Sequence, residues 1–99
     1  KKDGKRNMLN ENQQNRFTLR AKEVVQNLLK ELNIANLDDN NICDLQSALD
    51  LKVASLVSEQ EDGESIDNEL LEIYDLLVDI VIDNEDNVDF LNNLFFDKE

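Results

Sequence analysis

Residues 65–84 read SIDNELLEIYDLLVDIVIDN and carry the strongest structural signal in the chain. The apolar side chains recur at the three- and four-residue spacing of an α-helical face, and neighbouring positions widen that face to more than half of the circumference. They are Ile66, Leu70, Leu71, Ile73, Tyr74, Leu76, Leu77, Val78, Ile80 and Val81. Because so much apolar surface needs covering on several sides, the spacing predicts a central helix over about residues 65–84. Its charged residues recur every three or four positions rather than every two, which argues against strands.

Three further helices are predicted around this central one. They cover about residues 12–32, 42–58 and 86–96. The connecting sequences are short and rich in Asn, Asp and Gly, and Asn33 and Gly63 suit the left-handed backbone that ends many helices. The chain has no proline and only two glycines, which disfavours a fold built on tight β-turns. We therefore expect an all-α fold, either a small four-helix bundle or an orthogonal helical domain.

Charge is distributed very unevenly along the 99 residues, whose formal net charge is −13. Residues 1–22 contain seven bases and two acids, a net +5, whereas residues 23–99 contain three bases and 21 acids, a net −18. No Lys or Arg occurs between Lys52 and Lys98. This distribution predicts a flexible basic N-terminal arm over residues 1–11 and a single acidic helical domain over residues 12–99.

Two groups of acidic residues are candidates for binding a basic partner. Glu72, Asp75, Asp79 and Asp83 lie one turn apart on the central helix, and Glu59, Glu61, Asp62 and Glu64 lie in the preceding loop. Like charges at this helical spacing destabilise a helix by about 0.2–0.5 kcal/mol per pair, and no lysine on this helix compensates them. A cationic protein surface would relieve that repulsion. The alternative is an acidic helix face that contacts only solvent.

The last two predicted helices carry more apolar surface than a four-helix monomer readily covers, which suggests an interface. The residues expected there are Leu71, Val78, Ile82, Phe90, Leu94 and Phe96. A homodimer would cover them, and so would a different partner protein. In the homodimer hypothesis the basic arm contacts nucleic acid or another subunit.

The residue types that commonly perform catalysis or bind transition metals are scarce. The chain has no histidine, and Cys43, its only cysteine, has acidic neighbours that disfavour a thiolate. No glycine-rich phosphate loop is present. We expect no catalytic residues, no metal and no cofactor. The lone cysteine fits a reducing cytoplasm, and no apolar run is long enough for a membrane span.

These patterns favour a non-enzymatic interaction module that occludes a basic partner through an acidic helical face. Inhibitors, immunity proteins and antitoxins share this size and charge, which is an analogy of physical character only. The alternative is a homodimeric structural or regulatory module. The body of the domain is too negative for direct nucleic-acid binding. The only basic surface expected is the arm together with Lys22 and with Arg16 and Arg20, which lie outside the apolar face of the first predicted helix. The abundance of Asn and scarcity of Ala favour an AT-rich genome, such as that of a low-GC bacterium or its phage.

Overall fold

The computed structural model describes residues 9–96, which form five α-helices and no strand. The helices are α1 (Glu11–Arg16), α2 (Leu19–Glu31), α3 (Asn41–Glu61), α4 (Asn68–Asp83) and α5 (Val88–Phe96). The expected all-α fold is confirmed. Residues 1–8, which include most of the predicted basic arm, lie outside the described residues. Glu11, the last residue of that predicted arm, is the first residue of α1.

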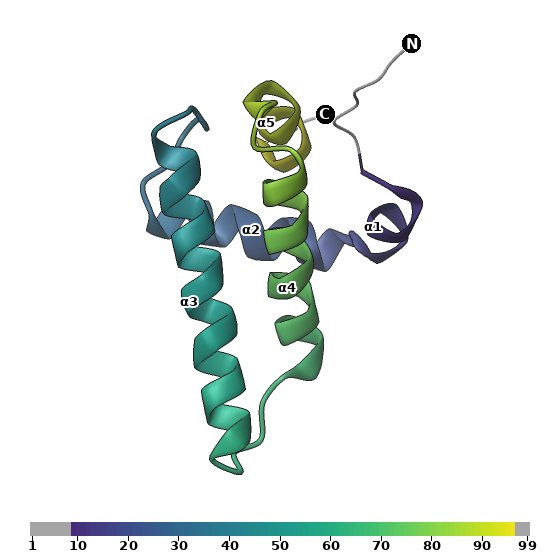
Figure 1. Cartoon of the computed structure of the whole chain (residues 1–99), viewed down its shortest axis with the longest axis vertical. Coiled ribbons are helices and arrows are strands. Elements are labelled where there is room, and N and C mark those ends of the chain that lie inside the picture. The colour runs from purple at the N-terminus through teal and green to yellow at the C-terminus, as the bar shows by residue number, and fades with distance from the viewer. Residues whose placement is uncertain (1–8, 97–99) are drawn as a thin grey trace.

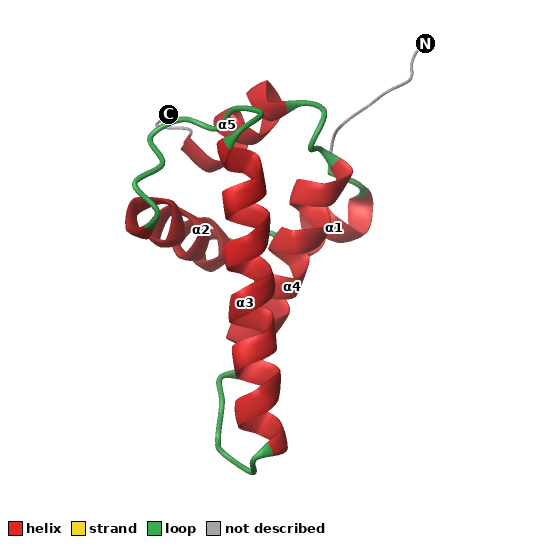
Figure 2. Cartoon of the chain, turned by 60° about the vertical axis from the view of Figure 1, so that its left-hand side comes forward, coloured by secondary structure: helices red, strands yellow, loops and turns green. Residues whose placement is uncertain are grey.

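Helices α3 and α4 pack side by side as a hairpin, and the other helices are arranged around one end of it (Figure 1). Helix α2 crosses one face of the hairpin, α1 lies beside α4, and α5 lies near the end of α4. Since α4 contacts α1, α2 and α3, the prediction of a central helix is confirmed. The opposite end of the hairpin extends beyond the other helices, which gives the molecule extents of 48 × 29 × 24 Å (Figure 2).

The prediction of one continuous helix over residues 12–32 is wrong, because the chain leaves the helical conformation at Phe17 and Thr18. Phe17 (ψ 95°) and Thr18 (ψ 175°) both have extended backbone. The Thr18 hydroxyl accepts a hydrogen bond from the backbone N–H of Ala21 and so caps α2. Threonine is favoured at such a cap and is neutral to unfavourable inside a helix. The break also brings the Phe17 ring to 6.3 Å from that of Phe95.

Two link residues have the left-handed backbone expected of them. Asn33 follows the end of α2 with φ 60°, and Gly63 follows α3 with φ 85°. Helix α4 begins at Asn68, three residues after the predicted start at residue 65, and Asp67 is its N-cap. The Asp67 carboxylate accepts the backbone N–H of Leu70 at 3.1 Å, which satisfies one of the free donors at the helix start.

The core lies where α2, α5 and the nearer halves of α3 and α4 meet. Its largest fully buried side chains include Leu29, Leu37, Leu45, Leu49, Leu76, Leu77, Ile80, Leu91 and Phe95. Side-chain hydrogen bonds also hold these elements together around the core. The Asn92 side chain binds both the N–H and the carbonyl of Leu37, and Gln26 donates to the carbonyl of Phe95. Asn84, fully buried, ends α4 and donates its side-chain N–H to the carbonyl of Ile80.

The core does not continue to the far end of the hairpin. Residues 50–72, all of them described, include no buried residue. We call this segment the distal hairpin. It contains the last three turns of α3, the link around Gly63 and the first turn of α4. Its apolar side chains are half-buried at most, and Leu51 is 70% exposed.

Candidate functional site

The acidic strip predicted on the central helix is present on α4. Glu72, Asp75, Asp79 and Asp83 are all exposed, and the helical rise places them along about 17 Å of the helix. Helix α4 carries no Lys or Arg to compensate them. We call these four residues the α4 strip.

The two ends of the α4 strip contact α1, and its middle does not. The Asp83 carboxylate accepts a hydrogen bond from the side chain of Gln13 at 2.8 Å. Arg16 donates to the backbone carbonyl of Glu72 at 3.4 Å, leaving the Glu72 carboxylate free of that contact. Asp75 and Asp79 make no ion pair or side-chain hydrogen bond within residues 9–96. These two carboxylates are therefore the most available of the strip to a cationic partner.

The second predicted acidic group lies at the end of the distal hairpin. Glu59 and Glu61 end α3, and Asp62 and Glu64 flank Gly63 in the link; all four acids are exposed. We call these four residues the tip acids. They lie at the point of the hairpin most distant from α5, at the lower end of the view in Figure 1. The α4 strip and the tip acids are thus two patches along one hairpin rather than a single cluster.

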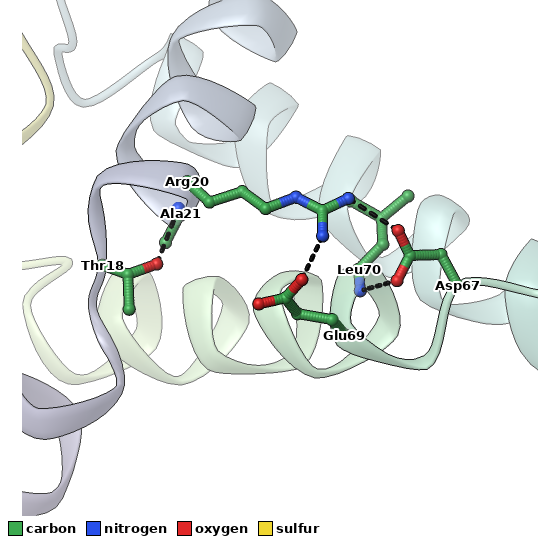
Figure 3. Close-up of polar contacts among 6 residues, drawn as sticks. All are labelled: Thr18, Arg20, Ala21, Asp67, Glu69 and Leu70. Atoms are coloured by element: carbon green, nitrogen blue, oxygen red, sulfur yellow. Dashed lines mark hydrogen bonds and ion pairs between the residues drawn. The ribbon is translucent and has the colours of Figure 1, made fainter.

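A cluster centred on Arg20 separates these two patches (Figure 3). The Arg20 guanidinium pairs with the Asp67 carboxylate at 2.6 Å and with the carboxylate of Glu69. The hydrogen bond from Arg20, together with the N–H of Leu70, lowers the pKa of Asp67. The same two carboxylates raise the pKa of Arg20. Arg20 therefore joins the first turn of α2 to the first turn of α4 and partly neutralises the acidic surface there.

Sequence reasoning missed the contribution of Arg20. It placed Arg16 and Arg20 on the outer side of the first helix, as part of the only basic surface available to nucleic acid. In the structure both side chains contact α4 instead. The acids that Arg20 contacts lie 47 and 49 residues later in the chain, and no local pattern indicates such a pair.

The predicted interface residues occupy two different parts of the molecule. Leu71 and Val78 are half-buried on α4, where Val78 packs against the edge of the core, and Ile82 is 51% exposed. Phe90, Leu94 and Phe96 are half-buried on α5 and pack against the core. Phe96 also lines an open hollow of about 400 Å³ beside the link that follows α2.

The hollows of the described surface are shallow and do not gather reactive side chains. One of about 190 Å³ lies between the link of α1 to α2 and α4, and Arg16, Glu69 and Glu72 line it. Within residues 9–96, no three His, Cys, Asp or Glu side chains are grouped so that they could hold a metal ion. Cys43 is exposed on α3. Among the described helices, none combines the length and apolar character that a membrane crossing requires.

Comparison of this chain with models of protein families, with curated proteins and with solved structures finds no match.

Proposed function

We propose that this protein is a non-enzymatic interaction module whose acidic α3–α4 hairpin binds a basic protein and occludes that partner's functional surface. The observation that carries the proposal is the charge of residues 53–96. This segment contains thirteen carboxylates and no Lys or Arg. Among the described residues, only Arg20 forms an ion pair with any of these carboxylates.

The shape of the acidic surface supports binding to another macromolecule. The α4 strip is a straight row on one helix, and the tip acids extend the negative surface to the end of a protruding element. An exposed row of carboxylates gives a long-range field that attracts a cationic surface and speeds association, most strongly at low salt. Each charge pair contributes little by itself when exposed, so many pairs have to act together.

A polyanion is a poor partner for this surface. Nucleic acid carries one negative charge per about 1.7 Å of duplex, and anionic membranes repel carboxylates in the same way. The same row of negative charge can instead compete with a nucleic acid for the basic groove of a protein that binds it. The class of partner we propose is therefore a protein with an exposed cluster of Lys and Arg.

Charge reversal in the middle of the α4 strip tests this proposal. Proteins from a native host lysate would be captured on the immobilised wild type and eluted by graded salt. We expect basic proteins that elute at moderate salt, and we expect Asp75→Lys with Asp79→Lys to lose them. The control carries the same change in net charge elsewhere, as Glu23→Lys with Asp44→Lys, both at exposed positions outside the hairpin's acidic surface. Unchanged capture by the Asp75 and Asp79 variant would reject the proposal.

The second candidate function is a homodimeric structural or regulatory module. The observation that favours it is the apolar row Leu71, Val78 and Ile82, which follows one side of α4 and leaves Ile82 half exposed. Light scattering at micromolar concentration distinguishes the candidates, because this one requires a dimer. Its nucleic-acid contact would depend on the basic arm, so deletion of residues 1–10 should abolish retention on DNA.

A further inference from the structure

One face of the α3–α4 hairpin carries two apolar rows that meet along its length. On α3, Gln46, Val53 and Val57 are spaced by seven and four residues and so share a side of the helix. On α4, Leu71, Val78 and Ile82 have the same spacing and also share a side. We call the five apolar residues of these two rows the hairpin seam.

Hydrogen bonds near both ends of the hairpin set the register of α3 against α4. Gln46, in the α3 row, donates to Glu85 beyond the end of α4 at 3.2 Å. Gln60, near the end of α3, donates to Asn68 at the start of α4 at 3.4 Å. Between Gln46 and Gln60 the hairpin extends for about 21 Å. In this register Val53 lies opposite Val78, and Val57 lies opposite the first turns of α4.

Helix α2 covers the other face of the hairpin. Lys52 of α3 lies 3.9 Å from Glu31 of α2, and together they line a small hollow with Val24, Leu28 and Tyr74. Lys52 and Val53 are consecutive in α3, so their side chains point about 100° apart. In the part of the chain that the structure describes, no helix covers the middle of the opposite face (Figure 1).

Carboxylates flank the seam on both sides. Asp50 is exposed on α3 beside Val53 and Val57, and Asp75 and Asp79 are exposed on α4 beside Leu71, Val78 and Ile82. The nearest base in sequence, Lys52, is directed to Glu31. The seam is therefore a strip of partly buried, uncharged side chains between two negative edges.

We propose that the hairpin seam is the docking site for a cationic amphipathic α-helix of the partner, about four turns long. Its apolar side would pack between α3 and α4, and its flanking Lys and Arg would pair with Asp50, Asp75 and Asp79. This inference rests on the proposed function and specifies how the basic partner is recognised. A second copy of this chain fits less well, because it would bring the same carboxylates together on two chains that each carry a formal −13.

A synthetic peptide tests the inference. The probe is a 16-residue Leu/Lys peptide with leucines at i, i+3, i+4 and i+7 and lysines beside them, compared with a scrambled peptide of identical composition. We expect the amphipathic peptide to bind at least tenfold more tightly by titration calorimetry. The amide shifts that change on binding should be concentrated at Val53, Val57, Leu71, Val78 and Ile82.

Matched variants separate apolar docking from charge attraction. Leu71→Gln with Ile82→Gln changes the seam, whereas Leu19→Gln with Leu51→Gln changes two exposed leucines outside it, which are 81% and 70% exposed. We expect the seam variant to bind the amphipathic peptide at least tenfold more weakly and the control to bind it normally, both variants having wild-type helical content.

Three results would overturn the inference. Equal affinity for both peptides, lost on Asp75→Lys with Asp79→Lys, would show attraction by charge alone and leave the proposed function standing. No binding of either peptide at millimolar concentration would reject the seam, while the lysate capture would still test the proposed function. A dimer in light scattering that the seam variant dissociates would identify a second copy as the occupant.

Discussion

The near and far halves of the α3–α4 hairpin are built from the same two helices but differ in what surrounds them. The near half provides Ile42, Leu45 and Leu49 from α3 and five buried residues from α4. The distal hairpin, residues 50–72, provides no buried residue. Its apolar residues are no less hydrophobic, and Val53, Leu56 and Leu70 would suit a core as well as Leu45 does. The difference lies in the third layer, since α2 buries the apolar side of the near half but contacts the distal half through the ion pairs of Arg20 with Asp67 and Glu69 and of Glu31 with Lys52.

Forming a helix and covering its apolar side are separate requirements. Local sequence is sufficient to form a helix with an apolar side, because spacing and capping act within a few residues. Covering that side requires neighbours, and a short helix in water is marginal without them.

Truncating a core leucine should have a much larger effect than truncating an apolar residue of the distal hairpin. Leu77 is fully buried on α4, so Leu77→Ala should lower the free energy of unfolding by about 2–5 kcal/mol. Leu56 is half-buried on α3, so Leu56→Ala should cost about 1 kcal/mol or less. Urea unfolding followed by circular dichroism measures both. Similar costs would mean that the distal hairpin is packed as tightly as the core.

Hydrogen exchange should distinguish the two halves within α3 itself. Amides near Leu45 and Leu49 are in the core and should exchange only through global unfolding. Amides between Ser55 and Glu61 should open locally and exchange at least tenfold faster, a difference of about 1.4 kcal/mol or more. Uniform protection along α3 would contradict this contrast. Saturating the hairpin seam with the amphipathic peptide should slow exchange between Ser55 and Glu61 and so reduce the difference along α3.

The link at the end of the distal hairpin should tolerate asparagine better than alanine. Gly63 has φ 85°, and an added Cβ would meet no atom within 4 Å, so backbone strain is the only penalty. We expect Gly63→Ala to lower stability by about 1 kcal/mol and Gly63→Asn to lower it less, since Asn adopts left-handed backbone more readily. Thermal unfolding of both variants checks this order. Equal losses of stability in the two variants would mean that a side-chain contact, and not the left-handed backbone, causes the loss.

The smallest predicted effect is a pH dependence at the boundary between the two halves. Arg20 lowers the pKa of Asp67 in the folded state, so the ionised carboxylate favours folding. This contribution is fully present above the unfolded pKa of about 3.9 and is lost as pH falls through the lower folded pKa. Asp67→Asn should remove it, so the stabilities of variant and wild type should converge in strong acid.

The pH experiment needs a matched control because all the acids of the chain are protonated together. Protonation also relieves repulsion among 23 Asp and Glu residues, which stabilises the compact state and opposes the loss at Asp67. Asp75→Asn removes one carboxylate that makes no ion pair within residues 9–96. We expect Asp75→Asn to be no less stable than the wild type at neutral pH, whereas Asp67→Asn should be less stable there and converge with the wild type in strong acid. Parallel behaviour of the two variants would contradict a specific role for the Arg20 cluster.

The helices were predictable from sequence because each has a local pattern. The apolar spacing of residues 66–81 predicted α4, and Asn33 and Gly63 marked helix ends through their backbone preference. The break at Thr18 was missed, because Phe17, Ala21 and Val24 keep helical spacing across it. Thr18 could have indicated the break, since a threonine followed by a helical pattern is a common N-cap.

Tertiary contacts account for what the sequence did not reveal about the candidate site. The exposed acids of the α4 strip and the link followed from charge and spacing. The separation of the acids into two patches depends on Arg20, and the uncovered seam depends on where α2 crosses the hairpin. Both are contacts between segments far apart in the chain, and periodicity contains no information about them.

The contacts of α1 and α2 have a consequence for the order of folding. Gln13 binds Asp83 and Gln26 binds Phe95, across 70 and 69 residues, whereas Gln60 binds Asn68 across only 8. Closing a short loop costs less chain entropy than closing a long one. The α3–α4 hairpin should therefore form first, and the two leading helices, although synthesised earlier, should dock last. During synthesis their apolar sides stay exposed until α4 and α5 have left the ribosome.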